Sequence, residues 1–353
     1  MFKNFAITGS TRNSDAYGQY PELSNCLQDL GMIESSIEDC EGLIFINYNK
    51  KSYKKYKRLG KNTDNMVLIR LEPEAVYPQQ YLESIEKKFK LIVSPGKQIN
   101  SNQKKSDFVG WPYKYNLNPA APKQSDPEIS YAIKKAVEEK VFDFEVWNSK
   151  KDKIVLIAAN KVSPTSNSNY KIRRNIAKKM HSSEIDIYGD LWKSSLTKKI
   201  YHRLAVCLYS LRTGFFPNLI ELYGGLFTRY KTVVGVTPDK HLVTRKYKYS
   251  LIIENSPDYC SEKLFDAIVN GSIPIYIGPK NEKIFLPNNL CYWSNGSIKD
   301  IRRFISSINS KRASDMLKSM ESYIQSESFK NSWISKNVYE QISKSVYDFW
   351  NVR

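Results

Sequence analysis

The sequence predicts an α/β fold with two Rossmann-like domains facing across a cleft. Short apolar runs with the length of buried strands alternate with helical or irregular segments, and this rhythm restarts after a polar stretch at 147–153. A length of 353 residues and a hydrophobic content of 41% suit two domains with separate cores. We therefore predict an N-terminal domain at 1–150, a C-terminal domain at 151–330 and a final helix at 331–353 that packs onto the body.

In the first half, strands are predicted at short runs that consist mainly of apolar residues. These runs are 43–47, 66–71 and 90–94. A helix is expected at 78–88 and another at 127–140, while the polar stretch at 94–124, rich in proline and asparagine, is predicted to be a loop.

The second half repeats the pattern with longer helices. Strands are predicted at 153–158, 185–189 and 233–236, and helices at 169–180 and 197–211. The helix at 197–211 is amphipathic with basic residues on its polar side. Such a helix usually packs against a core, but it can also lie on an anionic membrane. At 333–350, apolar residues recur at helical spacing, which predicts the final helix.

The segment 247–278 is the most informative part of the chain. An apolar strand (Leu251 to Ile253) is followed by polar residues, a turn, a helix at 261–270 ended by Gly271, and a second strand at 273–277. This is a βαβ unit, and open α/β sheets bind ligands at the carboxyl ends of their strands. The residues predicted to lie at that edge are Glu254, Asn255, Tyr259, Glu262 and Lys263. Helix N-termini favour phosphate, so this edge is a candidate phosphate site.

The net charge of +18 indicates an acidic partner, unless it only reflects a lysine-rich surface. The candidate partners are nucleic acid, an anionic membrane surface and a phosphate-bearing substrate. The basic runs are too dispersed for a nucleic-acid motif, and zinc-finger spacings are missing, so no nucleic-acid partner is expected.

The composition also predicts a cellular location. The longest apolar run has eight residues, whereas a membrane span needs about 18. The first residues lack the apolar core of a secretory signal, and the five cysteines are scattered without a Cys-x-x-Cys pair. We therefore expect a cytoplasmic protein with reduced thiols, with peripheral contact at the inner membrane face as a further prediction.

The motifs in 247–278 resemble a known family. Tyr247-Lys-Tyr, Glu254-Asn-Ser, Asp258-Tyr-x-x-Glu-Lys263 and Gly271-x-x-Pro-x-x-x-Gly278 occur in the order of the donor-site signature of the α1,3-fucosyltransferases, glycosyltransferase family 10. Weaker similarities to bacterial members surround Lys240, Arg173 and the segment 71–78.

The resemblance implies a GT-B-like arrangement and inverting transfer of L-fucose from GDP-fucose. The acceptor would be a glycan hydroxyl, at the α1,3 position of an N-acetylglucosamine- or glucose-type sugar in a surface polysaccharide or lipid-linked precursor.

The resemblance also assigns roles to the donor-site residues. Lys263 would bind phosphate in the first helical turn and Glu262 the ribose hydroxyls. Arg173 would bind phosphate bidentately, with Arg174 as the alternative. Asn255 and Tyr259 match donor-contacting positions, whereas Lys240 and Tyr247 match the family pattern without a defined role.

Glu72 is the predicted general base. It follows the strand at 66–71 in a Glu-Pro segment similar to the one that holds the family's proposed base, and Glu74 competes for the role.

No metal or other cofactor is expected. Many nucleotide-sugar enzymes hold a metal with an Asp-x-Asp motif, and this sequence has none. Cationic side chains and a helix N-terminus would then neutralise the diphosphate.

Two other functions remain open at this stage. A related glycosyltransferase would use another nucleotide sugar. Alternatively, the chain is a basic protein that binds nucleic acid or membranes through a non-catalytic Rossmann-like scaffold.

Overall fold

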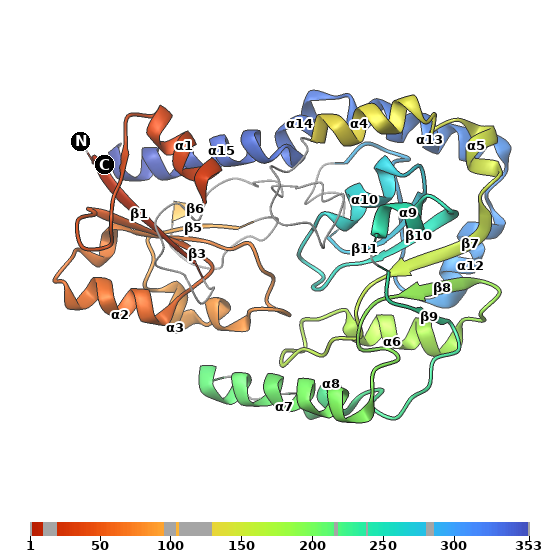
Figure 1. The fold of residues 1–353 in the computed structure, drawn as a ribbon, viewed down its shortest axis with the longest axis horizontal. Helices are drawn as coiled ribbons and strands as arrows, with labels where there is room; N and C mark the ends of the chain where they lie inside the picture. The colour runs from red at the N-terminus through yellow and green to blue at the C-terminus, as the bar shows by residue number, and fades with distance from the viewer. Residues whose placement is uncertain are drawn as a thin grey trace. The chain divides into compact units, whose positions relative to one another are not determined.

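The computed structural model describes residues 2–9, 20–94, 104–105, 129–214, 218–237, 239–279 and 286–351. The chain divides into two compact units, and each contains its own parallel sheet (Figure 1). Unit 1 comprises Met1–Pro112 and Asn331–Arg353, and unit 2 comprises Tyr113–Lys330. The predicted α/β class with two Rossmann-like units is confirmed.

The sheet of unit 1 has the strand order β2-β1-β3-β4-β5-β6. Its strands are β1 Asn4–Gly9, β2 Ile33–Glu34, β3 Gly42–Ile46, β4 Met66–Ile69, β5 Leu91–Val93 and β6 Lys104–Lys105. Its helices are α1 Pro21–Asp29, α2 Lys50–Arg58, α3 Glu83–Glu86 and α15 Ser335–Asn351, with 3-10 turns η1 Thr63–Asn65 and η2 Pro78–Tyr81.

Helices cover both faces of this sheet. One face packs against α1 and α15 through residues such as Leu27 and Val338, and the other packs against α2 and α3 through Tyr56 and Ile85. Burial on both faces explains why the strands read as continuous apolar runs.

The sheet of unit 2 has the order β12-β11-β10-β7-β8-β9. Its strands are β7 Lys151–Ile157, β8 Ile185–Tyr188, β9 Val233–Gly235, β10 Tyr247–Ile253, β11 Ile273–Ile277 and β12 Tyr292–Trp293. The described helices are α4 Ile129–Glu138, α5 Phe144–Asn148, α6 Tyr170–Lys179, α7 Leu196–Thr213, α8 Leu219–Tyr223, α9 Lys240–Thr244, α10 Lys263–Val269, α12 Ile298–Ser306, α13 Ser310–Ile324 and α14 Glu327–Trp333.

The boundary between the units differs from the predicted one at 150. The polar stretch at 147–153 lies inside unit 2, where it contains the end of α5 and the start of β7. Trp147 explains the difference, because its indole N–H donates to the carbonyl of Lys248 at 3.0 Å and its ring meets Tyr249 edge-on. The chain passes between units after Pro112 instead, in the predicted loop at 94–124, most of which lies outside the described residues.

The C-terminal helix returns to unit 1 instead of extending unit 2. Trp350 stacks on Phe2 with ring centroids 5.1 Å apart, and its indole N–H donates to the carbonyl of Asn65 at 3.2 Å. The two ends of the chain therefore complete one core.

The βαβ unit of 247–278 is present as β10, α10 and β11. The bounds of β11 match the predicted strand, but α10 begins at Lys263, two residues after the predicted start, and has seven residues. Gly271 follows the helix with a φ of 59°, a conformation that favours glycine.

Across the described ranges, no helix combines the length and the apolar content needed to cross a membrane.

Candidate functional site

A cavity of about 330 Å³ lies in unit 2, where α9 and α10 face β7 and β10. Its charged lining residues are Lys240 and Lys263 together with the carboxylates of Asp190, Glu262 and Asp266. This volume is at the lower end of the range for small-molecule pockets.

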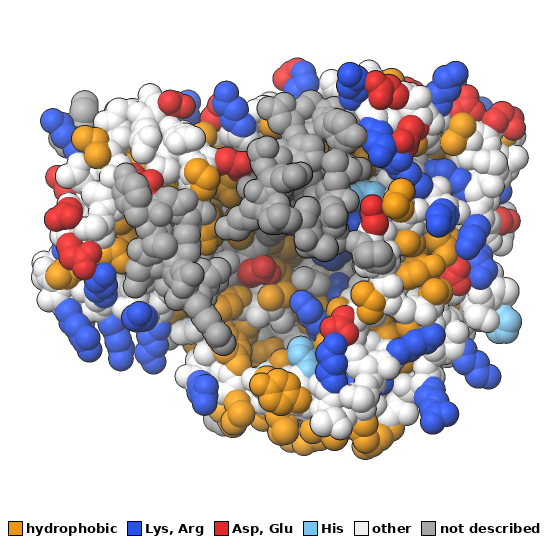
Figure 2. Space-filling view, viewed as in Figure 1, with side chains coloured by type: hydrophobic (Ala, Val, Ile, Leu, Met, Phe, Trp, Pro, Cys, Tyr) orange, Lys and Arg blue, Asp and Glu red, His pale blue; other side chains and the backbone are white. Residues whose placement is uncertain are grey.

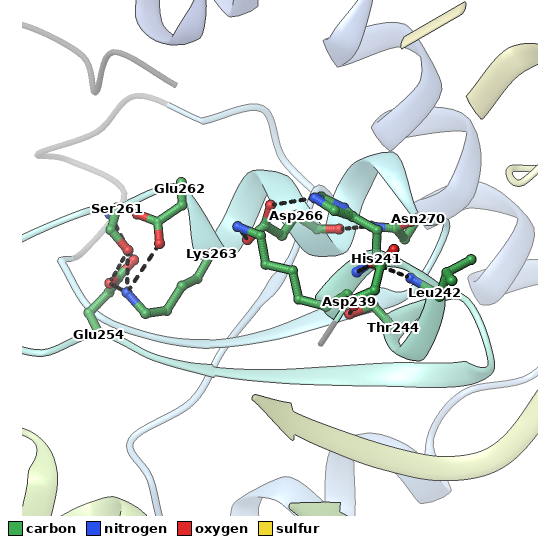
Figure 3. A network of polar contacts seen from close by, with 11 residues as sticks. Asp239, His241, Leu242, Thr244, Glu254, Ser261, Glu262, Lys263, Asp266 and Asn270 are labelled. Atoms are coloured by element: carbon green, nitrogen blue, oxygen red, sulfur yellow. Dashed lines mark hydrogen bonds and ion pairs between the residues drawn. The ribbon is translucent and has the colours of Figure 1, made fainter. Parts of the chain in front are cut away.

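Glu254 organises the turn that leads into α10. It directly follows β10 and is fully buried. Its carboxylate accepts hydrogen bonds from the backbone N–H of Ser261 at 2.9 Å and the Ser261 hydroxyl at 2.7 Å, and Lys263 Nζ lies 3.5 Å away (Figure 3). A buried carboxylate requires such partners, so Glu254 fixes both the turn and the lysine head.

Lys263 is the cation closest to this turn. Its side chain is 23% exposed and lines the cavity, and its ammonium donates to the Ser261 hydroxyl at 2.7 Å. Burial lowers the pKa of Lys263, but Glu262 and Glu254 outweigh this effect and raise the pKa above its ordinary value. Lys263 therefore carries its charge at neutral pH.

The pKa of Glu262 is shifted in the opposite direction from that of Lys263. Burial raises the pKa of its carboxyl group, but Lys263 and Lys240 outweigh this and hold the pKa below its usual value. The cavity thus contains an ionised carboxylate 4.0 Å from the Lys263 ammonium.

Lys240 brings the second cation to the cavity from α9. Its ammonium lies 2.6 Å from a carboxylate oxygen of Asp266, which is one helical turn beyond Lys263 on α10. Farther along α10, the side-chain amide of Asn270 lies 2.9 Å from Nδ1 of His241 (Figure 3). These contacts hold α9 against α10.

The charges at the cavity suit a ligand with two kinds of polar group. Lys240 and Lys263 can donate to phosphate oxygens, which ammonium groups bind as point charges. The carboxylates of Glu262 and Asp190 can accept hydrogen bonds from hydroxyl groups. The three carboxylates outnumber the two cations. The cavity therefore favours a phosphate ester that also offers hydroxyl groups to the carboxylates over a bare anion.

Arg173 and Asn255 are brought together at the end of β10. The Arg173 guanidinium, on α6, donates to the carbonyl of Ile253 at 2.5 Å and to Oδ1 of Asn255 at 2.8 Å. Arg173 is only 3% exposed, and the described residues that line the cavity do not include it. Its alternative, Arg174, donates to the carbonyl of Lys161 at 3.2 Å.

Several buried polar atoms near this edge have no hydrogen-bond partner among the described residues. They are the side-chain amide of Asn160, Nδ2 of Asn169 and Nε of Arg173. Asn160 follows β7, and the other two lie at the start of α6. Unsatisfied buried groups are uncommon and often mark a ligand contact, so they extend the candidate site toward β7 and α6.

The structure places Tyr247 and Tyr259 away from the cavity lining. Tyr247 begins β10, and its hydroxyl donates to Asp186 at 2.8 Å. Seven strand residues span about 20 Å, so Tyr247 lies at the opposite end of β10 from Glu254. Tyr259 is buried, with 4% of its surface exposed.

Glu72 lies in unit 1, two residues beyond Arg70 at the carboxyl end of β4. Its backbone N–H donates to Oδ1 of Asn47 at 3.0 Å, and its carbonyl accepts from Gln80 at 2.8 Å and Tyr81 at 3.0 Å. Three side chains therefore fix the backbone of Glu72 by hydrogen bonds, while its own side chain is half-buried.

Glu254 was predicted to lie at this edge of the sheet but had no assigned role, and Asp266 was not predicted as a site residue. A glutamate immediately after a fully apolar strand was a usable sign of a buried carboxylate. Asp266 had no comparable sign, because its pairing with Lys240 depends on how α9 packs against α10.

Within the described ranges, no three His, Cys, Asp or Glu side chains gather in a way that could hold a metal ion.

No protein-family model matches the sequence. A fucosyltransferase-like protein of Arabidopsis thaliana is 33% identical over 84 residues, which are 23% of this chain and 16% of that protein. An α-(1,4)-fucosyltransferase of the same plant is 31% identical over 99 residues, which are 28% of this chain and 24% of that enzyme. The chain is similar to fucosyltransferases over about a quarter of its length. The resemblance seen in the sequence is thus confirmed, although the match spans less than a quarter of either fucosyltransferase.

The fold of this chain is also found in a solved structure. The Anabaena protein HepE, in complex with UDP and glucose, aligns over 99% of this chain and 100% of its own length, with a TM-score of 0.52 and 10% identity. At this identity the likeness concerns the fold.

Proposed function

We propose that the chain is an inverting fucosyltransferase that transfers L-fucose from GDP-fucose to a hydroxyl of a glycan acceptor. The observation that carries the proposal is the position of Lys263. A charged lysine, held by the buried Glu254, lines a cavity together with Lys240 at the end of the βαβ unit whose residues resemble the fucosyltransferase donor signature.

In this proposal, unit 2 binds the donor. Lys263 and Lys240 neutralise the diphosphate as it leaves, and Glu262 accepts hydrogen bonds from the ribose hydroxyls. Arg173 supports the site through the carbonyl of Ile253 and the side chain of Asn255. With only seven residues in α10, side-chain cations contribute more than the helix dipole.

Unit 1 supplies the base and binds the glycan acceptor. Direct displacement with inversion requires a group that accepts the proton of the attacking hydroxyl. Glu72 is the candidate, because its backbone is fixed by Asn47, Gln80 and Tyr81 while its carboxylate is half-exposed. Glu74, which is also half-buried, is the alternative. The proposed linkage is α1,3 to an N-acetylglucosamine- or glucose-type sugar.

Calorimetric titration of the wild-type protein with GDP, GDP-fucose, UDP and UDP-glucose tests the proposed donor. We expect the two guanine nucleotides to bind at least tenfold more tightly than the uridine nucleotides. Preference for the uridine species would replace fucose transfer with transfer from another nucleotide sugar. Indifference to all four, with tight binding to random DNA that weakens steeply with salt, would favour a nucleic-acid-binding protein.

A further inference from the structure

Helix α7 turns its apolar side chains outward. Its 18 residues run from Leu196 to Thr213, and its buried residues are Lys199, Arg203 and Ser210, all of them polar. Meanwhile Leu204, Leu208 and other apolar residues are exposed. An ordinary surface helix buries the apolar stripe, so this orientation is the reverse of the expected one.

Specific hydrogen bonds hold the helix in this orientation. The guanidinium of Arg203 donates to the carbonyls of Leu222 and Gly224 in and after α8. Rotating α7 to bury its leucines would expose Arg203 and leave those carbonyls without their donor. The outward apolar face is therefore a fixed feature of the fold.

The exposed side chains of α7 continue onto α8 and the turn after it. We call this the α7–α8 apolar face, and in Figure 2 hydrophobic side chains gather along the lower edge, where Figure 1 places these helices. Its members are Leu196, Ile200, Tyr201, Leu204, Leu208, Leu211, Leu219, Ile220, Tyr223 and Phe227, exposed by 39% to 80%. A patch of ten large apolar side chains marks an interaction surface.

The charges around the α7–α8 apolar face are almost all positive. The segment 191–231 contains seven lysines and arginines and a single acidic residue. The exposed basic residues of this segment are Lys193, Lys198, Arg212, Arg229 and Lys231. Apolar side chains bordered by exposed cations are typical of helices that lie in the interface of an anionic bilayer.

We propose that the α7–α8 apolar face docks on an anionic phospholipid membrane, with the leucines of α7 inserted below the headgroups and the flanking cations on the lipid phosphates. A second copy of this chain is a poorer partner, because a symmetric contact would place the same cations against one another. The inference depends on the segment 191–231 alone and is independent of the choice of donor.

Vesicle co-sedimentation tests the proposal directly. Wild-type protein is mixed with vesicles of equal parts phosphatidylglycerol and phosphatidylcholine, and separately with pure phosphatidylcholine. We expect binding to the anionic vesicles that weakens as salt is added. The double variant Leu204→Glu/Leu208→Glu should bind the anionic vesicles at least tenfold less, and Arg212→Gln/Arg229→Gln should lose about fivefold for each residue replaced.

A matched variant controls for the loss of exposed apolar side chains. Ile33→Glu/Leu59→Glu replaces residues of unit 1 that are 58% and 44% exposed, and it should bind vesicles like the wild type. Both variants should fold, since all four substituted apolar side chains are exposed, and circular dichroism checks this.

Three results would overturn the proposal. The first is a wild-type protein that does not sediment with anionic vesicles, and the second is a Leu204→Glu/Leu208→Glu variant that sediments with them as well as the wild type does. The third is a wild-type dimer in sedimentation velocity that the double variant converts to monomers without any vesicle binding, which would make a second copy the occupant.

Discussion

At the scale of single residues, the candidate site depends on a buried carboxylate. Glu254 is fully buried and accepts from Ser261 twice, with Lys263 at 3.5 Å. Because the charge of Glu254 also raises the pKa of Lys263, losing it would affect both the turn and the cation. Lys263, the predicted phosphate ligand, and the carboxylate of Glu254 therefore work as a pair.

Replacing this carboxylate should destabilise the protein. In Glu254→Gln, an amide group replaces an acceptor and faces the donors of Ser261 and Lys263. We expect the free energy of unfolding to fall by about 3 kcal/mol, as for other buried ion pairs that lose one partner. Chemical denaturation measures the change. Glu327→Gln, which removes an exposed contact with Lys330 at 2.5 Å, should change it by less than about 0.5 kcal/mol, and equal effects would refute the structural role of Glu254.

Replacing the proposed base should separate catalysis from donor binding. In Glu72→Gln the side chain keeps its size but cannot accept the acceptor proton, so kcat for fucose transfer should fall by about a hundredfold or more. GDP affinity should stay within twofold, because Glu72 belongs to unit 1 and the cavity to unit 2. Glu74→Gln is the matched control; a larger loss in that variant would move the role of base to Glu74.

At the scale of elements, strand positions could be predicted more reliably than the roles of the residues on them. The run Ile273–Ile277 is wholly apolar and forms β11 with the predicted bounds. Tyr247 belongs to the same motif as Glu254, but a strand separates the two, so sequence proximity alone could not place both at one edge. Helix α2 (Lys50–Arg58) was not predicted, because its sequence is mostly basic and it buries only Ser52 and Tyr56.

The turn between α10 and β11 requires glycine for two reasons. Gly271 has a φ of 59°, and a Cβ there would lie 2.0 Å from the carbonyl oxygen of Val141. Gly271→Ala should therefore lower the free energy of unfolding by more than about 2 kcal/mol, since strain and overpacking add. Gly60 also has a positive φ, of 70°, but a Cβ there would meet no atom within 4 Å. Gly60→Ala should therefore lower the free energy of unfolding by only about 1 kcal/mol in denaturant titrations. If both variants lose the same free energy of unfolding, the contact with the Val141 carbonyl does not explain the need for glycine at 271.

The packing of α9 on α10 should be sensitive to acid. Burial, followed by the charge of Lys240, lowers the pKa of His241 from 6.5 to about 3. Between these values the unfolded chain binds a proton that the folded chain does not, so stability falls as the pH falls. This group should contribute up to about 1.4 kcal/mol per pH unit.

Comparing unfolding of the wild type and His241→Gln from pH 7 to pH 4 isolates this contribution, because all other groups are shared. The variant should lose less stability on acidification. Parallel pH profiles would show that His241 titrates normally.

At the scale of the whole molecule, the α/β class with two Rossmann-like units followed from strand rhythm and was confirmed, but the route of the chain was not predicted in full. Helix α15 completes the core of unit 1, as the stacking of Trp350 on Phe2 shows. Such a return depends on packing between the two ends of the chain, which no local pattern reveals. The sequence left open whether α7 packs against the core or lies on a membrane, because the periodicity of a helix does not tell which face is buried.

The central claim is that Lys263 binds the diphosphate of a guanine nucleotide in unit 2. The most direct measurement is the calorimetric affinity for GDP of Lys263→Ala beside Lys299→Ala, which removes an exposed lysine of α12 in the same unit. We predict that Lys263→Ala weakens GDP binding by at least tenfold and that Lys299→Ala matches the wild type. Unchanged GDP affinity in Lys263→Ala would contradict the account and move the diphosphate away from the α10 turn.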